Sequence, residues 1–135
     1  EQERLIREMA AARPVRFLAG SYEPEEFFSI ARGHEKDPEG GERCHRCYEL
    51  RLDRAAREAA SGNFDFFTTT LSISPLKNAR WLNDIGCRLA GQYGIPYLVS
   101  DFKKKNGYKR SVELSALYGL YRQDYCGCVY SRAEA

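Results

Sequence analysis

Two cysteine pairs near opposite ends of the chain constrain the fold most. Cys44 and Cys47 form a Cys-x-x-Cys motif, and Cys126 and Cys128 flank a glycine close to the carboxyl end. A local zinc ribbon needs its second pair within about 20 residues of the first, but residues 48–125 separate these two pairs. Thiols that act together from such distant positions must be brought to one place by the whole domain. The chain is therefore expected to fold around a site that uses both pairs.

Paired cysteines of this kind suit metal chemistry. Thiolates bind Zn²⁺ and also hold iron–sulfur clusters. A Cys-x-x-Cys pair at the start of a helix suits either, because the helix N-terminus lowers the thiol pKa. Two other interpretations stay open, a redox dithiol and cysteines that only pack. Cys87 lies in the middle of a predicted helix without a partner nearby, so we expect it to be a packing residue.

Length and composition indicate one domain over residues 1–135, with 43% apolar and 30% charged residues. No apolar run approaches the roughly 18 residues of a membrane span, so no membrane partner is expected. The odd number of cysteines suits a reducing compartment, and a cytoplasmic location is predicted. The first residues have the character of a helix interior and carry no secretory signal. We therefore expect the chain to be the C-terminal part of a longer metalloenzyme.

The order of the predicted elements indicates an α/β fold. Helices are predicted at residues 1–11, 24–31, 44–61, 74–93 and 109–121, and strands at residues 15–18, 64–69 and 95–100. This alternation favours a parallel sheet with right-handed crossovers and helices on both faces. Sites in such sheets lie beyond the carboxyl ends of the strands, so residues 68–77 and 101–110 should rim one crevice.

These two segments also carry side chains that could bind a ligand. Residues 68–78 combine hydroxyls, Lys77 and a helix start, which suits a phosphate or a sugar-like diol. Ordinary helix capping explains the same residues equally well. Residues 101–110 interleave basic and aromatic side chains, as RNA-binding surfaces do, although a solvated lysine run is common. A Ser–His–Asp signature, a P-loop and a GxGxxG motif are all absent from the sequence, which weakens hydrolase, NTPase and nicotinamide-dependent functions.

Taken together, the motifs resemble those of one family, the epoxyqueuosine reductases of the QueH type. The matching residues are 38–52, 67–78, 101–104, 107–111 and 120–131, in order along nearly the whole chain. One departure is the absence of a Cys-Cys-x-Pro type of motif, which follows the first strand in such proteins and would lie upstream of Glu1. We expect the first strand and helix of the sheet to be missing with it.

The resemblance implies a Rossmann-like (HUP-type) three-layer sandwich with a parallel sheet. It also implies a [4Fe–4S] cluster with an adjacent metal ion, expected to be iron. The implied substrate is tRNA that carries epoxyqueuosine in its anticodon, and removal of the epoxide oxygen would give queuosine. The expected ligands are Cys44, Cys47, Cys126 and Cys128, together with the missing motif. The electron donor is an unidentified partner.

Other roles are assigned by position. Asp101 and Lys77 are candidates for catalytic proton supply. For tRNA binding, the residues expected to contact the phosphate backbone are Lys103, Lys104, Lys109, Arg110 and Arg122, with Tyr108 stacking on a base. Two alternatives remain: a zinc-structured RNA-binding module without catalysis, and a sulfur-transfer enzyme that acts on tRNA. The lack of an ATP-binding motif counts against the second.

Overall fold

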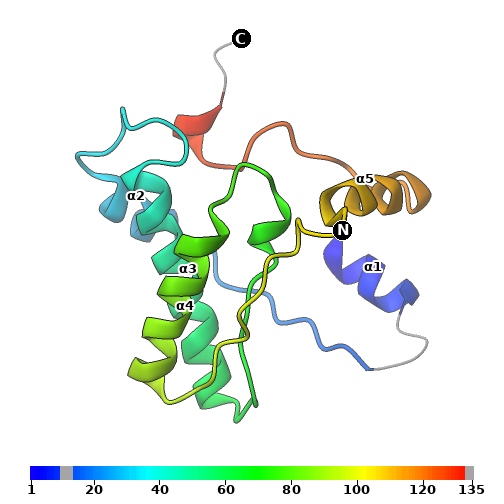
Figure 1. Cartoon of the computed structure of the whole chain (residues 1–135), viewed down its shortest axis with the longest axis horizontal. Helices are drawn as coiled ribbons and strands as arrows, with labels where there is room; N and C mark the ends of the chain where they lie inside the picture. Colours follow the sequence, from blue (N-terminus) through cyan, green and yellow to red (C-terminus); the bar gives the residue numbers. More distant parts are fainter. Residues whose placement is uncertain (10–13, 133–135) are drawn as a thin grey trace.

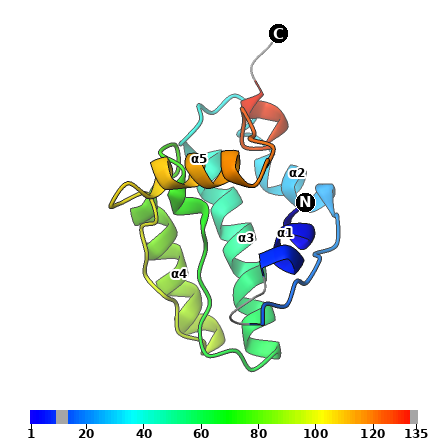
Figure 2. The ribbon, with the colours of Figure 1, turned by 90° about the vertical axis from the view of Figure 1, so that its right-hand side faces the viewer.

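Helices dominate the computed structural model, which describes residues 1–9 and 14–132. They are α1 (Gln2–Met9), α2 (Pro24–Ala31), α3 (Glu42–Ser61), α4 (Ala79–Tyr93) and α5 (Gly107–Leu117), with the short 3-10 turns η1 (Leu71–Ile73) and η2 (Val129–Ser131). Figure 1 shows α3 and α4 side by side at the lower left, with extended chain running past them. Figure 2 shows α5 lying across one end of this pair, below the C-terminal tail.

Helix α3 carries the first cysteine pair and half of the core. Its buried residues recur every three or four positions and are Cys44, Tyr48, Leu52, Ala56 and Ala59, together with Arg43. This stripe is the face of α3 that packs into the core. The helix ends where the Gly62 N–H donates to the Glu58 carbonyl at 2.9 Å, as the predicted glycine stop requires.

Helix α4 supplies the other half of the core through Leu82, Ile85 and Leu89. It begins at Ala79, five residues later than the predicted start at residue 74. The reason is a competing cap, because the side-chain oxygen of Asn78 accepts a hydrogen bond from the Trp81 N–H at 3.1 Å. The helix ends as predicted, with Gly94 in the left-handed conformation at φ 70°.

The predicted three-layer sandwich with a parallel sheet is wrong for the described residues. The predicted strands at 64–69 and 95–100 run alongside each other, but they form only one parallel bridge, between Phe67 and Tyr97. Two backbone hydrogen bonds hold it, from Phe67 N–H to the Pro96 carbonyl at 3.1 Å and from Leu98 N–H to the Phe67 carbonyl at 2.9 Å. The predicted strand at 15–18 forms no strand at all.

The physical reason for this error lies in the backbone partners. Extended segments become a stable sheet only when neighbours pair their polar groups and cover both faces. Here Pro96 has no N–H to donate, and the Thr68 hydroxyl, not a backbone N–H, satisfies the Leu98 carbonyl at 2.8 Å. Phe67 packs into the core between the helices, whereas Phe66 on the other face is 60% exposed. Helices therefore cover one face of the extended pair among the described residues.

The remaining helices follow the sequence closely. Helix α2 has the predicted bounds, and α5 begins and ends a few residues earlier than predicted. The end of the first predicted helix, residues 10–11, lies outside the described residues. Within the part of the chain that the structure describes, none of the helices combines the length and apolar character that crossing a membrane requires.

Candidate functional site

A pocket of about 1270 Å³ lies where the two cysteine pairs meet. Its wall is built by α2, the first half of α3, the loop at residues 70–77, α5 and the C-terminal tail. Three of the four predicted cysteine ligands line it, namely Cys47, Cys126 and Cys128. The domain therefore brings the distant pairs to one place, as their spacing predicts.

The first pair is fixed by the opening turns of α3. Cys44 and Cys47 are three residues apart in the helix, so they share a face. Cys44 is 7% exposed, and its Sγ accepts a hydrogen bond from the Gly40 N–H at 3.2 Å. Cys47 lies one turn further along and is only partly buried. Cys44 thus lies in the buried core, and Cys47 lines the pocket.

The second pair sits in a tight turn of the tail. Gly127 has a φ of 92°, a conformation that side chains other than glycine rarely adopt, and it turns the chain between the two cysteines. The Ser131 hydroxyl oxygen lies 3.0 Å from the Cys126 Sγ and 2.9 Å from the Cys128 carbonyl oxygen, so its one proton can serve either acceptor. The fold of the tail is therefore held by its own polar contacts.

Cys47 and Cys126, one thiol from each pair, differ in acidity. Burial raises the pKa of the Cys47 thiol, because the thiolate would lose its hydration. Burial also raises the pKa of Cys126, but the hydrogen bonds from Ser131 and from the Cys128 backbone, with the charge of Lys77, outweigh it and leave the pKa below its usual value. The tail therefore holds the more reactive thiol of the two.

Lys77 and Tyr48 complete this part of the wall. The Lys77 Nζ lies 5.7 Å from the centroid of the Tyr48 ring. Burial and the neighbouring Cys44 thiol raise the pKa of Tyr48 to about 12, so its hydroxyl keeps its proton at neutral pH. That hydroxyl has no hydrogen-bond partner among the described residues. Lys77, a predicted proton source, thus lies beside the cysteines.

Asp101, the other predicted proton source, is not among the residues that line the pocket. Its Oδ1 accepts hydrogen bonds from the Lys103 backbone N–H at 3.3 Å and from Lys103 Nζ at 3.2 Å. Asp101 and Lys103 therefore form an ion pair within the basic loop. This pairing orders the loop and engages one of the charges predicted to bind tRNA.

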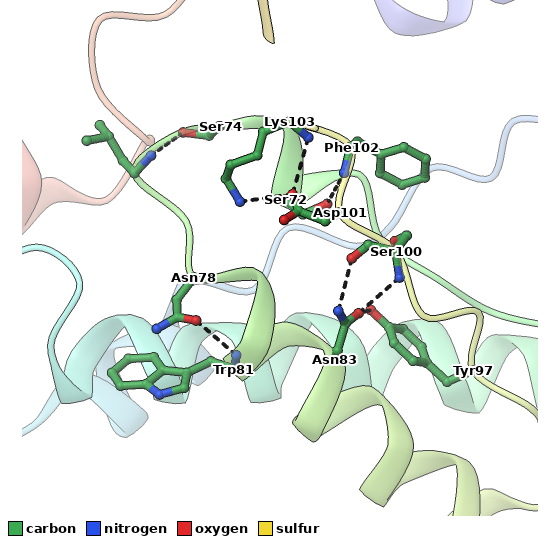
Figure 3. A network of polar contacts seen from close by, with 11 residues as sticks. Ser72, Ser74, Asn78, Trp81, Asn83, Tyr97, Ser100, Asp101, Phe102 and Lys103 are labelled. Carbon is green, nitrogen blue, oxygen red and sulfur yellow. Dashed lines mark hydrogen bonds and ion pairs between the residues drawn. The ribbon is translucent and has the colours of Figure 1, made fainter. Parts of the chain in front are cut away.

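A polar network fastens the basic loop to the helical core, and Figure 3 shows it. The Asn83 side chain donates to the Ser100 carbonyl at 3.0 Å and accepts from the Ser100 N–H and the Tyr97 hydroxyl, both at 3.2 Å. The buried Ser72 hydroxyl accepts from the Phe102 N–H at 3.1 Å. Residues 68–77 and 101–110 therefore do meet, although no sheet directs them there.

The other predicted tRNA-binding residues lie on or near α5. Tyr108 and Arg122 line the pocket, with the Arg122 Cζ 5.7 Å from the centroid of the Tyr108 ring. The Arg122 Nη1 also donates to the Ser115 hydroxyl at 3.0 Å. Lys104, Lys109 and Arg110 are exposed, and Arg110 pairs with Glu113 at 3.2 Å. The Arg122 guanidinium and the Tyr108 ring thus lie together on the pocket wall, with exposed cations nearby.

The four cysteines of the two pairs are the side chains here that could supply ligands to the implied metal centre. Thiolates are the ligands that iron–sulfur clusters require. No group of three or more His, Cys, Asp or Glu side chains within residues 1–9 and 14–132 is close enough to hold a single metal ion. A cluster asks for wider spacing, because each cysteine binds a different iron atom. Three thiols line one pocket, and thiols are the type of ligand that such a cluster would use.

Comparisons with known proteins agree with the motifs. The family model described as "Epoxyqueuosine reductase QueH" matches residues 1–134. A Streptococcus pyogenes protein of that name is 50% identical over 117 residues, covering 87% of this chain and 46% of the relative. The Staphylococcus epidermidis protein is 41% identical over 119 residues, covering 87% and 50%. The Thermotoga maritima protein is 37% identical over 118 residues, covering 85% and 62%.

The chain thus spans about half the length of the curated relatives it matches. The match nevertheless runs through both cysteine pairs, the Lys77 loop and the basic loop, because it extends over residues 1–134. On this evidence the chain belongs to the epoxyqueuosine reductase QueH family.

Proposed function

We propose that the protein is an oxidoreductase that removes the epoxide oxygen of epoxyqueuosine in tRNA to give queuosine. The observation that carries the proposal is the meeting of Cys47, Cys126 and Cys128 on the wall of one pocket. The names of the relatives support the same activity. The reaction consumes two electrons and two protons, and the oxygen leaves as water. The site must therefore hold a redox centre, a proton source and the modified nucleoside.

The proposed redox centre is a [4Fe–4S] cluster with an adjacent iron ion. The residues that would hold it are Cys44, Cys47, Cys126 and Cys128, with further ligands outside this chain. When bound, these groups would supply single electrons and a Lewis acid for the departing oxygen. The Gly40 N–H already donates to Cys44 Sγ and so fixes the position of this sulfur.

The proposed proton source is Lys77, because its Nζ reaches the same pocket wall as the cysteines. An ammonium there can give a proton to oxygen at the moment the epoxide opens. Asp101 lies in the basic loop, where it forms an ion pair with Lys103. It would therefore have only a supporting role in proton supply. Tyr48 closes the wall behind Lys77 and excludes water from that side.

The tRNA is proposed to lie across α5 and the basic loop. Tyr108 and Arg122 would receive a base, since an aromatic ring and a guanidinium both stack on base faces. The exposed cations Lys104, Lys109 and Arg110, with Lys103, would follow the phosphate backbone. The flipped nucleoside would then enter the pocket toward the cysteines.

The test is anaerobic reconstitution of the intact protein with iron and sulfide, followed by assay on tRNA that carries epoxyqueuosine. Cys126→Ala should lose iron, sulfide and visible absorbance per chain, and should form no queuosine. Cys87→Ala is the matched control, because Cys87 is an exposed thiol on α4, away from the pocket wall. Full cluster absorbance in Cys126→Ala would refute the ligand assignment. One colourless zinc ion and tRNA binding without turnover would favour the non-catalytic module.

A further inference from the structure

Arg43 is a charged side chain buried at the junction of the two cysteine segments. It directly precedes Cys44, and only 2% of its surface is exposed. Its Nη1 lies 3.1, 3.2 and 2.6 Å from the backbone carbonyl oxygens of His34, Glu35 and Asp37, which share its two hydrogens. One guanidinium nitrogen therefore gathers three carbonyls of the preceding loop at the start of α3.

That same loop reaches the first cysteine. The backbone N–H of Arg43 donates to the Asp37 carboxylate at 3.2 Å, and the Gly40 N–H donates to Cys44 Sγ. The loop thus touches Arg43 at one end and the thiol at the other. Any change that releases the Arg43 guanidinium should loosen the hydrogen bond to the Cys44 sulfur as well.

The Arg43 guanidinium also contacts the C-terminal tail. The Arg43 Cζ lies 5.5 Å from the centroid of the Tyr130 ring in η2, two residues beyond Cys128. The ring of Phe27 in α2 also lies near the Tyr130 ring, with the two centroids 6.3 Å apart. Since Ser131, the next residue, contacts Cys126, a displacement of Tyr130 would be passed to the second cysteine pair.

The charge of Arg43 has no carboxylate partner among the described residues. A buried cation is costly unless other groups compensate it. The Arg43 Nε keeps no hydrogen-bond partner among the described residues, but carbonyl dipoles and an aromatic face compensate the rest of the charge. A lysine ammonium can lie over a ring, as Lys77 does at Tyr48, but it is a compact charge without the planar fork that contacts the carbonyls and the ring together here. The geometry therefore favours arginine at this position.

We propose that Arg43 is a positioning residue that holds the Cys126–Cys128 tail against the Cys44–Cys47 helix turn through Tyr130. The clamp sets the separation of the two thiol pairs across the pocket. Its relevance to cofactor binding rests on the proposed function, but the clamp itself is a property of the chain.

The first experiment is amide hydrogen exchange on the intact, reduced, metal-free protein. Arg43→Lys should speed exchange about 5–30-fold in both residues 34–41 and residues 126–131, the factor expected for losing a desolvated cation–π contact. Arg46→Lys is the matched control, since Arg46 is an exposed cation on the same helix turn and pairs with Glu42. Faster exchange confined to residues 34–41 would overturn the clamp.

Tyr130 variants separate the clamp from a folding defect at Arg43. Tyr130→Leu leaves the loop carbonyls bound to Arg43 but removes the aromatic face, so exchange should rise in residues 126–131 and stay unchanged in residues 34–41. Tyr130→Phe keeps the ring and should match the wild type. If Arg43→Lys does not fold, the Tyr130→Leu result decides, and an unchanged tail would overturn the proposal.

The second experiment measures Co²⁺ affinity through the thiolate-to-cobalt absorption band. Arg43→Lys should weaken binding about 5–30-fold in the wild-type background. In a Cys126→Ala/Cys128→Ala background the same change should have little effect, because the tail no longer supplies thiols. Equal losses in both backgrounds would overturn the proposal. A wild-type protein that binds no cluster would refute the proposed cofactor, while the exchange result would still decide on the clamp.

Discussion

The hydroxyl oxygen of Ser72 accepts a hydrogen bond from the backbone N–H of Phe102 at 3.1 Å, across a separation of thirty residues in sequence. Ser72 is 1% exposed, so this bond forms away from water. It joins η1, which precedes Lys77, to the loop that holds Asp101 and Lys103 (Figure 3). A single buried hydroxyl thus links the pocket wall to the basic loop.

Replacing Ser72 with alanine should lower the free energy of unfolding by about 1–3 kcal/mol, because the Phe102 N–H would lose its acceptor. Urea denaturation would measure this loss. Ser74→Ala is the control, since Ser74 Oγ accepts only a local bond from the Leu76 N–H at an exposed site. Its effect should stay within about 0.5 kcal/mol. Equal effects of the two changes would mean that the link from Ser72 to Phe102 contributes nothing beyond a local cap.

Two glycines in α4 should respond to alanine in opposite directions. A Cβ on Gly86 would lie 2.5 Å from the ring of Tyr97, whose hydroxyl donates to Asn83, whereas a Cβ on Gly91 would meet open space. Gly86→Ala should therefore destabilise the fold by about 1–3 kcal/mol through overpacking. Gly91→Ala should stabilise it by about 0.5–1 kcal/mol, because alanine favours the helix. Thermal unfolding of both variants would measure the contrast, and a stabilised Gly86→Ala protein would contradict this packing.

The helices could be predicted because their signals are local. The buried stripe of α3 follows from residues spaced three or four apart. The ends of α3 and α4 follow from the single glycines Gly62 and Gly94. The sheet could not be predicted, because alternating apolar residues show that a segment suits a strand but not whether partners exist for its backbone. Phe67 and Tyr97 form a bridge, and no further strand among the described residues extends it.

The functional site, like the fold, could be predicted from the sequence only in part. The cysteine spacing led to the expectation that the distant pairs approach one another, and Cys47, Cys126 and Cys128 do line one pocket. The roles of Arg43 and Asn83 depend on carbonyls and amides contributed by distant loops. In a sequence, an arginine beside a Cys-x-x-Cys motif is expected to be a surface charge. Only the structure shows that the Arg43 side chain is buried, which is the basis for proposing it as a clamp. Four acidic or basic groups of the basic loop and α5 likewise pair with one another in ways that the sequence leaves open.

Salt dependence should show which cations meet tRNA. Lys103→Gln/Lys104→Gln should reduce the slope of log K against log salt by about 1–2, if both side chains contact phosphates. Arg32→Gln/Lys36→Gln is the control, because it removes two exposed charges near α2 and away from the basic loop. Filter binding of tRNA over a range of salt concentrations would measure both slopes. An unchanged slope in the first variant would remove the basic loop from the tRNA contact.

The pKa values of Cys47 and Cys126, two half-buried thiols of the pocket, are shifted in opposite directions from the usual value of a thiol. In reduced, metal-free protein, alkylation of Cys126 should reach half its maximal rate at a lower pH than alkylation of Cys47, because only the thiolate reacts. Mass spectrometry of peptides alkylated across a pH series would separate the two.

Ser131→Ala identifies the cause of that difference. Losing the hydroxyl beside Cys126 Sγ should move the Cys126 profile to higher pH and leave the Cys47 profile in place. Because the folded-state pKa of Cys126 is depressed, its thiolate stabilises the fold above the unfolded-state pKa, and this contribution is lost as pH falls through the folded-state value. The stability difference between wild type and Ser131→Ala should therefore contain a part that grows as pH rises through that window. A Cys126 profile that does not move would mean that Lys77 and the Cys128 backbone, not Ser131, set its acidity.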